Sequence, residues 1–179
     1  LVGATVWHDV NGDGIQDDGE PSTTTDITGA FTLDATLAEG DSLYVKGGYD
    51  LGTGKPNDHT FKLTVSSAGA EGGDSLIVSP VSTQVSRAYA KSGVTLDQAL
   101  AKIAEAYGLD ETFPDLTNFD PIALAYGATT DAEAKAALTA QAKNIMVTTL
   151  GEVSVKVSEY FTTSIAPTVR KQITDIFEF

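Results

Sequence analysis

Residues 3–25 read GATVWHDVNGDGIQDDGEPSTTT and decide how the first part of the chain folds. Within them, the twelve residues 9–20 place an oxygen donor at each position that a calcium-binding loop uses. The candidate ligands are the side chains of Asp9, Asn11, Asp13, Asp17 and Glu20 and the backbone carbonyl of Ile15. Gly14 occupies the sixth position, where the backbone of such a loop turns sharply. The sequence therefore predicts a Ca²⁺ site in residues 9–20.

A polar turn is the alternative interpretation of this stretch, because Asp, Asn and Gly dominate turns in general. That interpretation does not explain why alternate positions carry oxygen donors, nor why the twelfth is Glu20. Without a metal, the four carboxylates and the adjacent Asp18 would repel one another at close range. We therefore expect the loop to loosen when Ca²⁺ is removed.

The residues on either side of the loop indicate what kind of calcium site it is. Pro21 and a run of β-branched threonines follow the loop, and this favours a strand over the helix of an EF-hand. Residues 3–7 alternate between polar and apolar and also predict a strand. The motif occurs once, whereas a dockerin carries two copies. We expect an EF-hand-like loop that joins two strands.

Composition excludes several classes of function. The chain has 11 basic and 25 acidic residues, so its net charge of −14 disfavours nucleic acid and anionic lipid as partners. No apolar run approaches the roughly 18 residues of a membrane span, so no membrane insertion is expected. The absence of cysteine excludes disulfides, thiolate zinc sites and cysteine nucleophiles. Together with the calcium loop, these features predict an extracellular protein, secreted or at the cell surface.

The periodicity of the chain changes near residue 78 and predicts two regions in an α+β protein. Residues 1–78 contain short β-type segments separated by Gly, Asp and Asn, which predict a small β-sandwich of prealbumin or immunoglobulin type. The predicted strands are Val2 to Trp7, the threonine run after Pro21, Ala30 to Leu33, Ser42 to Lys46, Thr60 to Val65 and Leu76 to Val78. Residues 47–58 are predicted as a loop.

Residues 79–179 have helical periodicity and predict a bundle of four to five helices, one of them long. Ser79 and Pro80 favour the start of the first helix, and two capping boxes favour the start of later ones. The capping boxes pair Thr95 with Gln98 and Thr130 with Glu133. The long helix is allowed from residue 131 to about 161, and we expect the helical region to pack at least partly on the sandwich.

No constellation of an active site is evident, so we predict no catalytic residue and no enzymatic activity. His8 and His59 lie outside any metalloprotease motif, and no nucleophile elbow is present. A Ser-His-Asp triad stays open, as does a glycosidase pair such as Asp17 with Asp18 or Asp110 with Glu111, although a chain this acidic is expected to carry such pairs.

Aromatic side chains could instead form a ligand platform, with a place in the hydrophobic core as the alternative. The candidates are Tyr44, Tyr49, Phe61, Phe113 and Phe119. Trp7 precedes the calcium loop in an alternating strand, so it lies either beneath the loop or outward as a contact residue.

Residues 3–21, with Thr25-Asp26 and Gly29-Ala30-Phe31, resemble the calcium-binding B-type, prealbumin-like modules of bacterial surface proteins. Further stretches are similar to modules of the very large, repeat-rich adhesins of Gram-negative bacteria, including RTX-type adhesins. These are residues 47–54, 78–83, 107–109 and 115–121. The strand and loop after Pro21 are shorter than in the B-type pattern, which puts a standard seven-stranded sandwich in doubt.

The resemblance implies a non-enzymatic, calcium-stabilised extracellular module of an adhesin, with a structural or adhesive role. Its expected partners are calcium and neighbouring modules of the same long chain, and the first residue, Leu1, is consistent with a piece of a longer polypeptide. The alternative function is a ligand-binding module that recognises a glycan or peptide on a host or neighbouring cell.

Overall fold

The computed structural model describes residues 1–72, 76–91 and 93–107, together with residues 116, 120, 123, 127–136, 139, 142, 143 and 146. The elements bounded within these residues are β1 (Thr5–Asp9), β2 (Ser22–Thr24), β3 (Ser42–Lys46), β4 (Tyr49–Asp50), β5 (Lys55–Pro56), β6 (Thr60–Thr64), α1 (Ser67–Ala70), α2 (Pro80–Tyr89) and α3 (Leu96–Tyr107).

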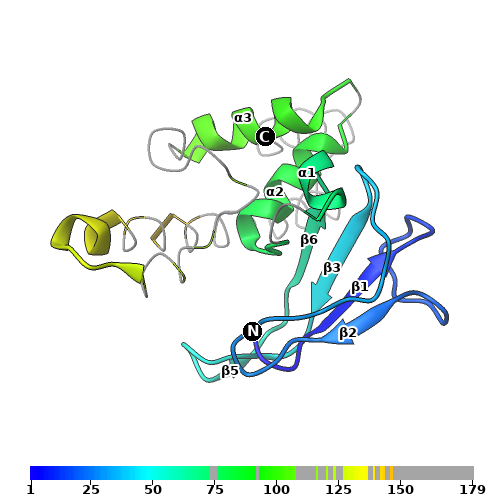
Figure 1. Ribbon diagram of the computed structural model, residues 1–179, viewed down its shortest axis with the longest axis horizontal. Helices are drawn as coiled ribbons and strands as arrows, with labels where there is room; N and C mark the ends of the chain where they lie inside the picture. Colours follow the sequence, from blue (N-terminus) through cyan, green and yellow to red (C-terminus); the bar gives the residue numbers. More distant parts are fainter. Residues whose placement is uncertain are drawn as a thin grey trace, which may run out of the picture.

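Four strands form one antiparallel sheet in the order β2-β1-β3-β6 (Figure 1). The short strands β4 and β5 form a separate hairpin within the predicted loop 47–58, and a bridge from Val2 to Tyr49 ties this hairpin to the start of the chain. Strand β1 lies between β2 and β3 and runs away from the N-terminus towards residues 10–21 (Figure 1). The calcium loop and the hairpin therefore lie at opposite ends of the sheet.

One face of the sheet carries the hydrophobic core of the β region. Alternate residues of the three longer strands point to this face, because side chains alternate across a strand. They include Val6, Leu43, Val45, Phe61 and Leu63. Residues 31–37 cross the same face, with Phe31, Leu33 and Leu37 packed inward and residues 32, 34 and 36 exposed. Residues 76–78 complete the cover.

Within the described residues, six strands form this four-stranded sheet and the two-stranded hairpin and no second sheet packs on the first, so the predicted β-sandwich is wrong. Two of the predicted strands, residues 30–33 and 76–78, are extended but join neither sheet. Both segments bury apolar side chains against the sheet, but their backbones pair with no strand. Their apolar side chains are therefore buried as those of a strand would be, although they form no second sheet.

A tight turn at residues 26–30 leads into residues 31–37, which cover the β core; we call residues 31–37 the extended cover segment. The Asp26 carboxylate accepts hydrogen bonds from the hydroxyl and amide of Thr28 and from the amide of Ala30. The bonds from Thr28 hold the pKa of Asp26 below its usual value of 3.8. Gly29 takes a φ of 86°, in the left-handed region that favours glycine.

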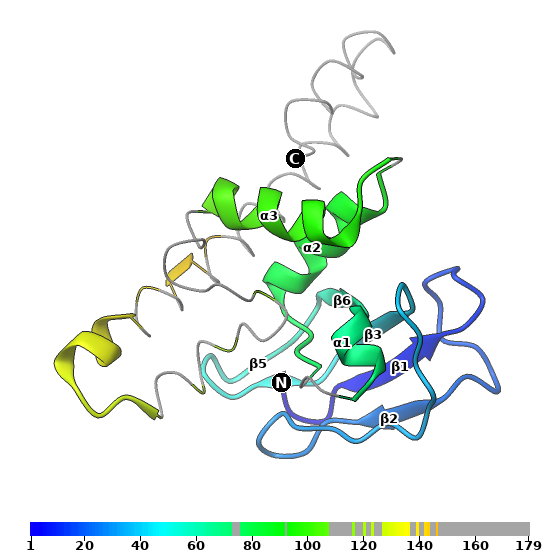
Figure 2. The same cartoon turned by 45° about the horizontal axis from the view of Figure 1, so that its top comes forward.

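Helix α2 lies along the outer edge of β6 (Figures 1 and 2), where its hydroxyl side chains bond to the strand. The Lys62 amide donates to Thr83 Oγ1 at 2.9 Å, and Ser82 Oγ donates to the Lys62 carbonyl at 2.8 Å. Further along, Thr64 Oγ1 donates to Ser86 Oγ at 3.0 Å. The Ser82 and Thr83 hydroxyls satisfy the backbone amide and carbonyl of Lys62, which an edge strand otherwise leaves to solvent.

The opposite face of α2 packs against α3 in a second hydrophobic core. Its buried members are Val81, Val85, Ala88, Leu96, Ala99, Ile103 and Leu116. Both helices begin as predicted: Ser79 caps α2 ahead of Pro80, and Thr95 and Gln98 form the capping box of α3. Helix α2 contacts β6, so the first helix of the region after residue 78 packs on the four-stranded sheet.

The predicted bundle of four to five helices is also wrong. Within the described residues, three helices have both ends defined, and of these only α2 and α3 have seven residues or more. Because the hydroxyl face of α2 contacts β6, only its apolar face remains for packing against another helix. Helix α3 packs on that face. The capping box of Thr130 with Glu133 is present, and residues 131–136 are helical. Residues 147–179, which include about half of the predicted long helix, lie outside the described residues.

Candidate metal centre

Residues 10–21 connect β1 to β2, its antiparallel neighbour in the sheet (Figure 2). Trp7 lies opposite Ser22, and the amide of His8 donates to the carbonyl of Pro21. The prediction that the loop joins two strands is therefore confirmed. Asp9 is the last residue of β1, and Glu20 comes two residues before β2, so the first and twelfth loop positions lie at the base of one connection.

Asp9 organises the first half of the loop. Its side chain is 5% exposed, and its carboxylate accepts three backbone amides. Oδ1 accepts from Gly12 at 2.9 Å and from Asp13 at 3.1 Å, while Oδ2 accepts from Gly14 at 3.0 Å. This arrangement folds residues 12–14 back over the end of β1.

Glu20 closes the loop from its other end. Its Oε1 accepts from the amide of Val10 at 2.8 Å, and its Oε2 accepts from the amide of Asp17 at 3.2 Å. One carboxylate thus bonds to the beginning and to the second half of the loop. The twelfth position therefore fixes how far the loop can open.

Asn11, Asp13 and Asp17 come together between these two anchors. Asn11 Nδ2 donates to Asp13 Oδ2 at 3.2 Å and to Asp17 Oδ2 at 2.8 Å. Asn11 Oδ1 accepts the amide of Asp13 at 3.0 Å, and Asp13 Oδ1 accepts the amide of Ile15 at 2.8 Å. Two carboxylates that repel each other therefore share one amide group as their common donor.

The donor chemistry of the loop fits a hard divalent cation. An ionised carboxylate offers about four lone-pair sites, and backbone amides take three at Asp9 and two at Glu20. Lone pairs therefore remain on both anchors, and the Asn11 amide supplies only partial positive charge between Asp13 and Asp17. A calcium ion would supply a full double charge to the same oxygens.

A metal centre built from three or more His, Cys, Asp or Glu side chains is not present among the residues that the structure describes. Two of the six predicted ligands are of another kind, namely the Asn11 amide oxygen and the Ile15 carbonyl. Calcium sites commonly use both kinds of oxygen. The assignment of the six ligands stays a prediction.

A ladder of three cross-strand side chains lies beneath the loop, on the face of the sheet opposite the β core. Trp7 on β1 stacks on Tyr44 on β3, with ring centroids 5.2 Å apart and an interplanar angle of 14°. Lys62 on β6 places its Nζ 5.0 Å from the centroid of the Tyr44 ring. We call Trp7, Tyr44 and Lys62 the aromatic ladder.

The loop approaches the aromatic ladder at Gly14. A Cβ atom placed on Gly14 would lie 3.3 Å from Tyr44 Oη and 3.6 Å from Tyr44 Cζ. Trp7 is 3% exposed, and its Nε1 has no hydrogen-bond acceptor among the described residues. Of the two positions predicted for Trp7, the buried one is confirmed. Its indole is held by packing and stacking.

His8, the neighbour of the loop, pairs with an acidic side chain of the segment that leads into β3. Its Nε2 lies 3.1 Å from Asp41 Oδ2, and both lie near the base of the loop. This pair connects β1 to the start of β3. His8 itself is a buried residue of β1, directly before Asp9.

The aromatic candidates for a ligand platform do not gather at one place. Tyr44 belongs to the aromatic ladder, Phe61 packs on the β core, and Tyr49 is 52% exposed on the distant hairpin. Phe113 and Phe119 lie outside the described residues, as do Asp110 and Glu111.

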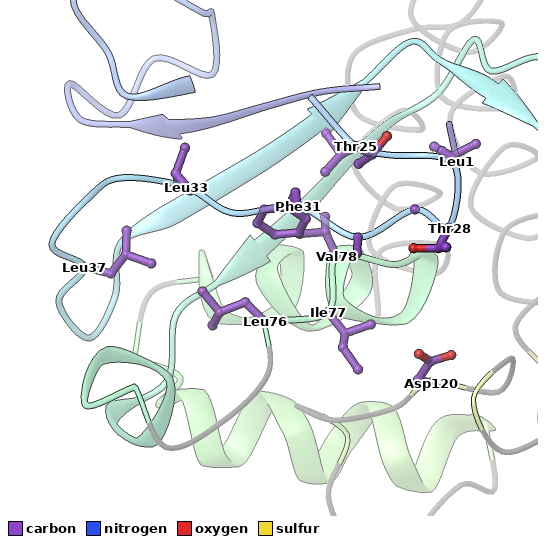
Figure 3. A pocket seen from close by; sticks show the side chains of 13 residues that line it. Leu1, Thr25, Thr28, Phe31, Leu33, Leu37, Leu76, Ile77, Val78 and Asp120 are labelled. Carbon is purple, nitrogen blue, oxygen red and sulfur yellow. The ribbon is translucent and has the colours of Figure 1, made fainter. Parts of the chain in front are cut away.

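A hollow of about 630 Å³ opens between the extended cover segment and residues 76–78 (Figure 3). Most of the residues that line it are apolar, among them Phe31, Leu33, Leu76 and Val78, and Asp120 lies at one side. The apolar residues are the same side chains that cover the β core. The hollow is therefore a gap in the packing of that cover and brings together no set of chemically reactive groups.

Comparison of the chain with protein families, with curated proteins and with solved structures finds no match in any of the three. None of the helices in the described part of the chain is both long and apolar enough to span a membrane.

Proposed function

We propose that residues 9–20 bind Ca²⁺ and that the chain is a non-enzymatic, calcium-stabilised extracellular module with a structural or adhesive role. The observation that supports the calcium site best is the convergence of Asn11, Asp13 and Asp17 between the two anchors, Asp9 and Glu20. The six oxygen donors predicted from the sequence thus belong to one folded loop. The adhesive role rests on the resemblance of residues 3–31 to surface-protein modules.

The loop would act as a clamp between two neighbouring strands. Asp9 belongs to β1, and Glu20 leads into β2, so ligands from both ends would share one ion. The side chains of Asp9, Asn11, Asp13, Asp17 and Glu20 and the carbonyl of Ile15 would hold Ca²⁺. The bound ion would neutralise carboxylates that otherwise repel one another. A clamp of this kind stabilises a shape, and no helix follows the loop that calcium could reorient.

Calcium binding should raise stability by mass action. A ligand present at a hundred times its Kd stabilises the folded state by about 2.7 kcal/mol. The unfolded loop is expected to bind the ion weakly, because its six donors are then far apart. Millimolar calcium outside the cell would keep even a moderate site occupied.

Calorimetric titration and thermal unfolding test the calcium proposal. We expect the metal-free protein to bind calcium with a stoichiometry near one, and EDTA to lower the Tm of the calcium-loaded protein. Asp9→Ala and Glu20→Ala should weaken binding sharply, since each removes an anchor carboxylate. Asp18→Asn is the matched control, because Asp18 is an exposed carboxylate of the same loop outside the predicted ligand set.

An unchanged Tm on adding EDTA, together with no heat of calcium binding, would sink the calcium proposal. If Asp18→Asn lost as much calcium affinity as Asp9→Ala, the total charge of the loop alone would determine calcium binding. A glycan array and a peptide library, each screened with and without calcium, test the adhesive role. A specific ligand bound equally well in EDTA would favour the alternative ligand-binding module.

A further inference from the structure

We infer that Tyr44 is a positioning residue for calcium: its ring forms the floor on which the turn of the calcium loop rests. This inference rests on the proposed calcium site. It assigns a role in metal binding to a side chain that lies outside the loop and provides no ligand. The residues that carry it are Tyr44, Gly14 and the two other members of the aromatic ladder.

The position of the Tyr44 ring is fixed from both sides. Strand β1 pairs Trp7 with Tyr44, and strand β6 pairs Lys62 with Tyr44, so the ring lies in the middle of three neighbouring strands. Trp7 stacks on it at 5.2 Å, and the Lys62 ammonium lies 5.0 Å from its centroid. Stacking and cation–π contacts each favour this orientation. A ring held in this way is a rigid support.

The Tyr44 ring approaches the calcium loop at Gly14, the position where the backbone of the loop turns sharply. Gly14 has a φ of 76°, and its amide bonds to Asp9 Oδ2 at 3.0 Å. The three atoms nearest to a Cβ built on Gly14 all belong to Tyr44, at 3.3, 3.6 and 4.0 Å. The sharp turn of the loop therefore faces the edge of this ring. Without the ring, residues 12–14 would lose the surface that limits their movement towards the sheet.

Support of this kind affects metal affinity because ordering the loop is part of the free energy of binding. A loop that already has its ligands in place loses less conformational entropy when the ion binds. Groups that orient metal ligands commonly change affinity by about ten- to a hundredfold when they are removed. We expect Tyr44 to act in this range through Gly14 and Asp9.

Terbium luminescence tests the inference, because Tb³⁺ replaces Ca²⁺ in oxygen sites and an excited indole nearby sensitises its emission. Excitation at a wavelength that tyrosine does not absorb selects the indole of Trp7, the single tryptophan of the chain, which is buried in the aromatic ladder, so the signal has one origin. Calcium competition against Tb³⁺ then gives the calcium Kd. The variants are Tyr44→Phe, which keeps the ring, and Tyr44→Thr, which removes it and keeps a good strand former. Tyr49→Thr, on the distant hairpin, is the control.

We expect Tyr44→Thr to bind calcium at least about tenfold more weakly, with Tyr44→Phe and Tyr49→Thr within about twofold of the unaltered chain. Circular dichroism and urea unfolding of the metal-free proteins accompany each titration. If Tyr44→Thr is unfolded without metal, Tyr44→Leu takes its place. A merely structural role would lower the stability of the metal-free protein and leave the Kd of the folded fraction unchanged.

The inference is overturned if a folded variant without the ring binds calcium within about twofold of the unaltered chain, or if Tyr44→Phe loses as much affinity as Tyr44→Thr. Failure of the unaltered chain to bind either ion is a different result, because it removes the proposed calcium function itself.

Discussion

Gly47 and Gly48 follow β3 directly and have the same backbone conformation in very different surroundings. Their φ values are 71° and 77°, in the left-handed region that favours glycine. A Cβ on Gly47 would meet nothing within 4 Å, whereas a Cβ on Gly48 would lie 2.7 Å from the backbone nitrogen of Ala4. Ala4 is fully buried, so its backbone has no room to retreat. The pair separates the effect of backbone strain from the effect of close packing.

We expect Gly47→Ala to lower the free energy of unfolding by about 1 kcal/mol, the lower end of the range for left-handed backbone strain. Gly48→Ala should cost about 3 kcal/mol or more, because overpacking against Ala4 adds to the same strain. Urea unfolding of both variants measures the difference. Equal decreases in the free energy of unfolding in the two variants would contradict the close approach of residue 48 to Ala4.

Residues of the candidate site were predictable to the extent that they are neighbours in the sequence. The oxygen donors of residues 9–20 needed only their spacing to be recognised, and the hydrogen bonds of Asp9 and Glu20 join residues within the same loop or directly beside it. Tyr44 and Lys62 could not be assigned to the site. Their place beside Trp7 depends on the register of β1, β3 and β6, which the spacing of residues within one strand does not specify.

At the scale of elements, α2 shows how one helix can serve a sheet and another helix at once. Hydroxyl side chains at Ser82, Thr83 and Ser86 face β6, and apolar side chains on its other face pack against α3. Small hydroxyl groups let the helix approach the strand closely and still satisfy its backbone. The link between the two hydrophobic cores therefore contains specific hydrogen bonds.

Thr83→Val tests this link, because it replaces the acceptor of the Lys62 amide by a methyl group of similar size. We expect a loss of about 1 kcal/mol or more in unfolding free energy, since the amide is left without its partner. The exchange rate of the Lys62 amide should rise with it. Thr24→Val on the exposed side of β2 is the control and should stay within about 0.5 kcal/mol. An unchanged Lys62 amide in Thr83→Val would contradict the proposed role of the hydroxyl.

The starts of helices were predictable because caps are local: Ser79, Thr95 and Thr130 all bond to groups within three residues. The number of sheets was not. Residues 31–37 alternate between half-buried and exposed as a strand would, but the hydrogen bonds that make a strand depend on a partner elsewhere in the chain. Apolar periodicity likewise indicated α2, but it did not show that the hydroxyl side chains on one face of this helix bond to β6.

For the molecule as a whole, the calcium loop and the helix pair are attached to the four-stranded sheet at different strands. The loop joins β1 and β2, whereas α2 contacts β6, and β3 lies between (Figure 1). Within the sheet, a change at the loop therefore passes through β1 and β3 before it reaches β6 and the helix α2 that contacts it. We expect the effect of calcium to decrease along this path.

Hydrogen exchange with and without EDTA measures that decrease. Removing calcium should raise exchange most at the amides of β1 and β2, less in β6, and least in α3. Asp9→Ala in calcium should reproduce the pattern, and Asp18→Asn should not. If α3 opened as much as β1, the sheet and the helix pair would form a single cooperative unit, and the graded coupling proposed here would be wrong.

Helix α2 covers the edge strand β6, and this affects whether copies of the chain can assemble by pairing their edge strands. A sheet recruits further strands at an edge that has a long row of free amides and carbonyls. Here one outer strand is shielded by hydroxyls of a helix, and the other, β2, is only three residues long. The sheet is therefore a poor template for fibril growth, even when many copies are crowded together.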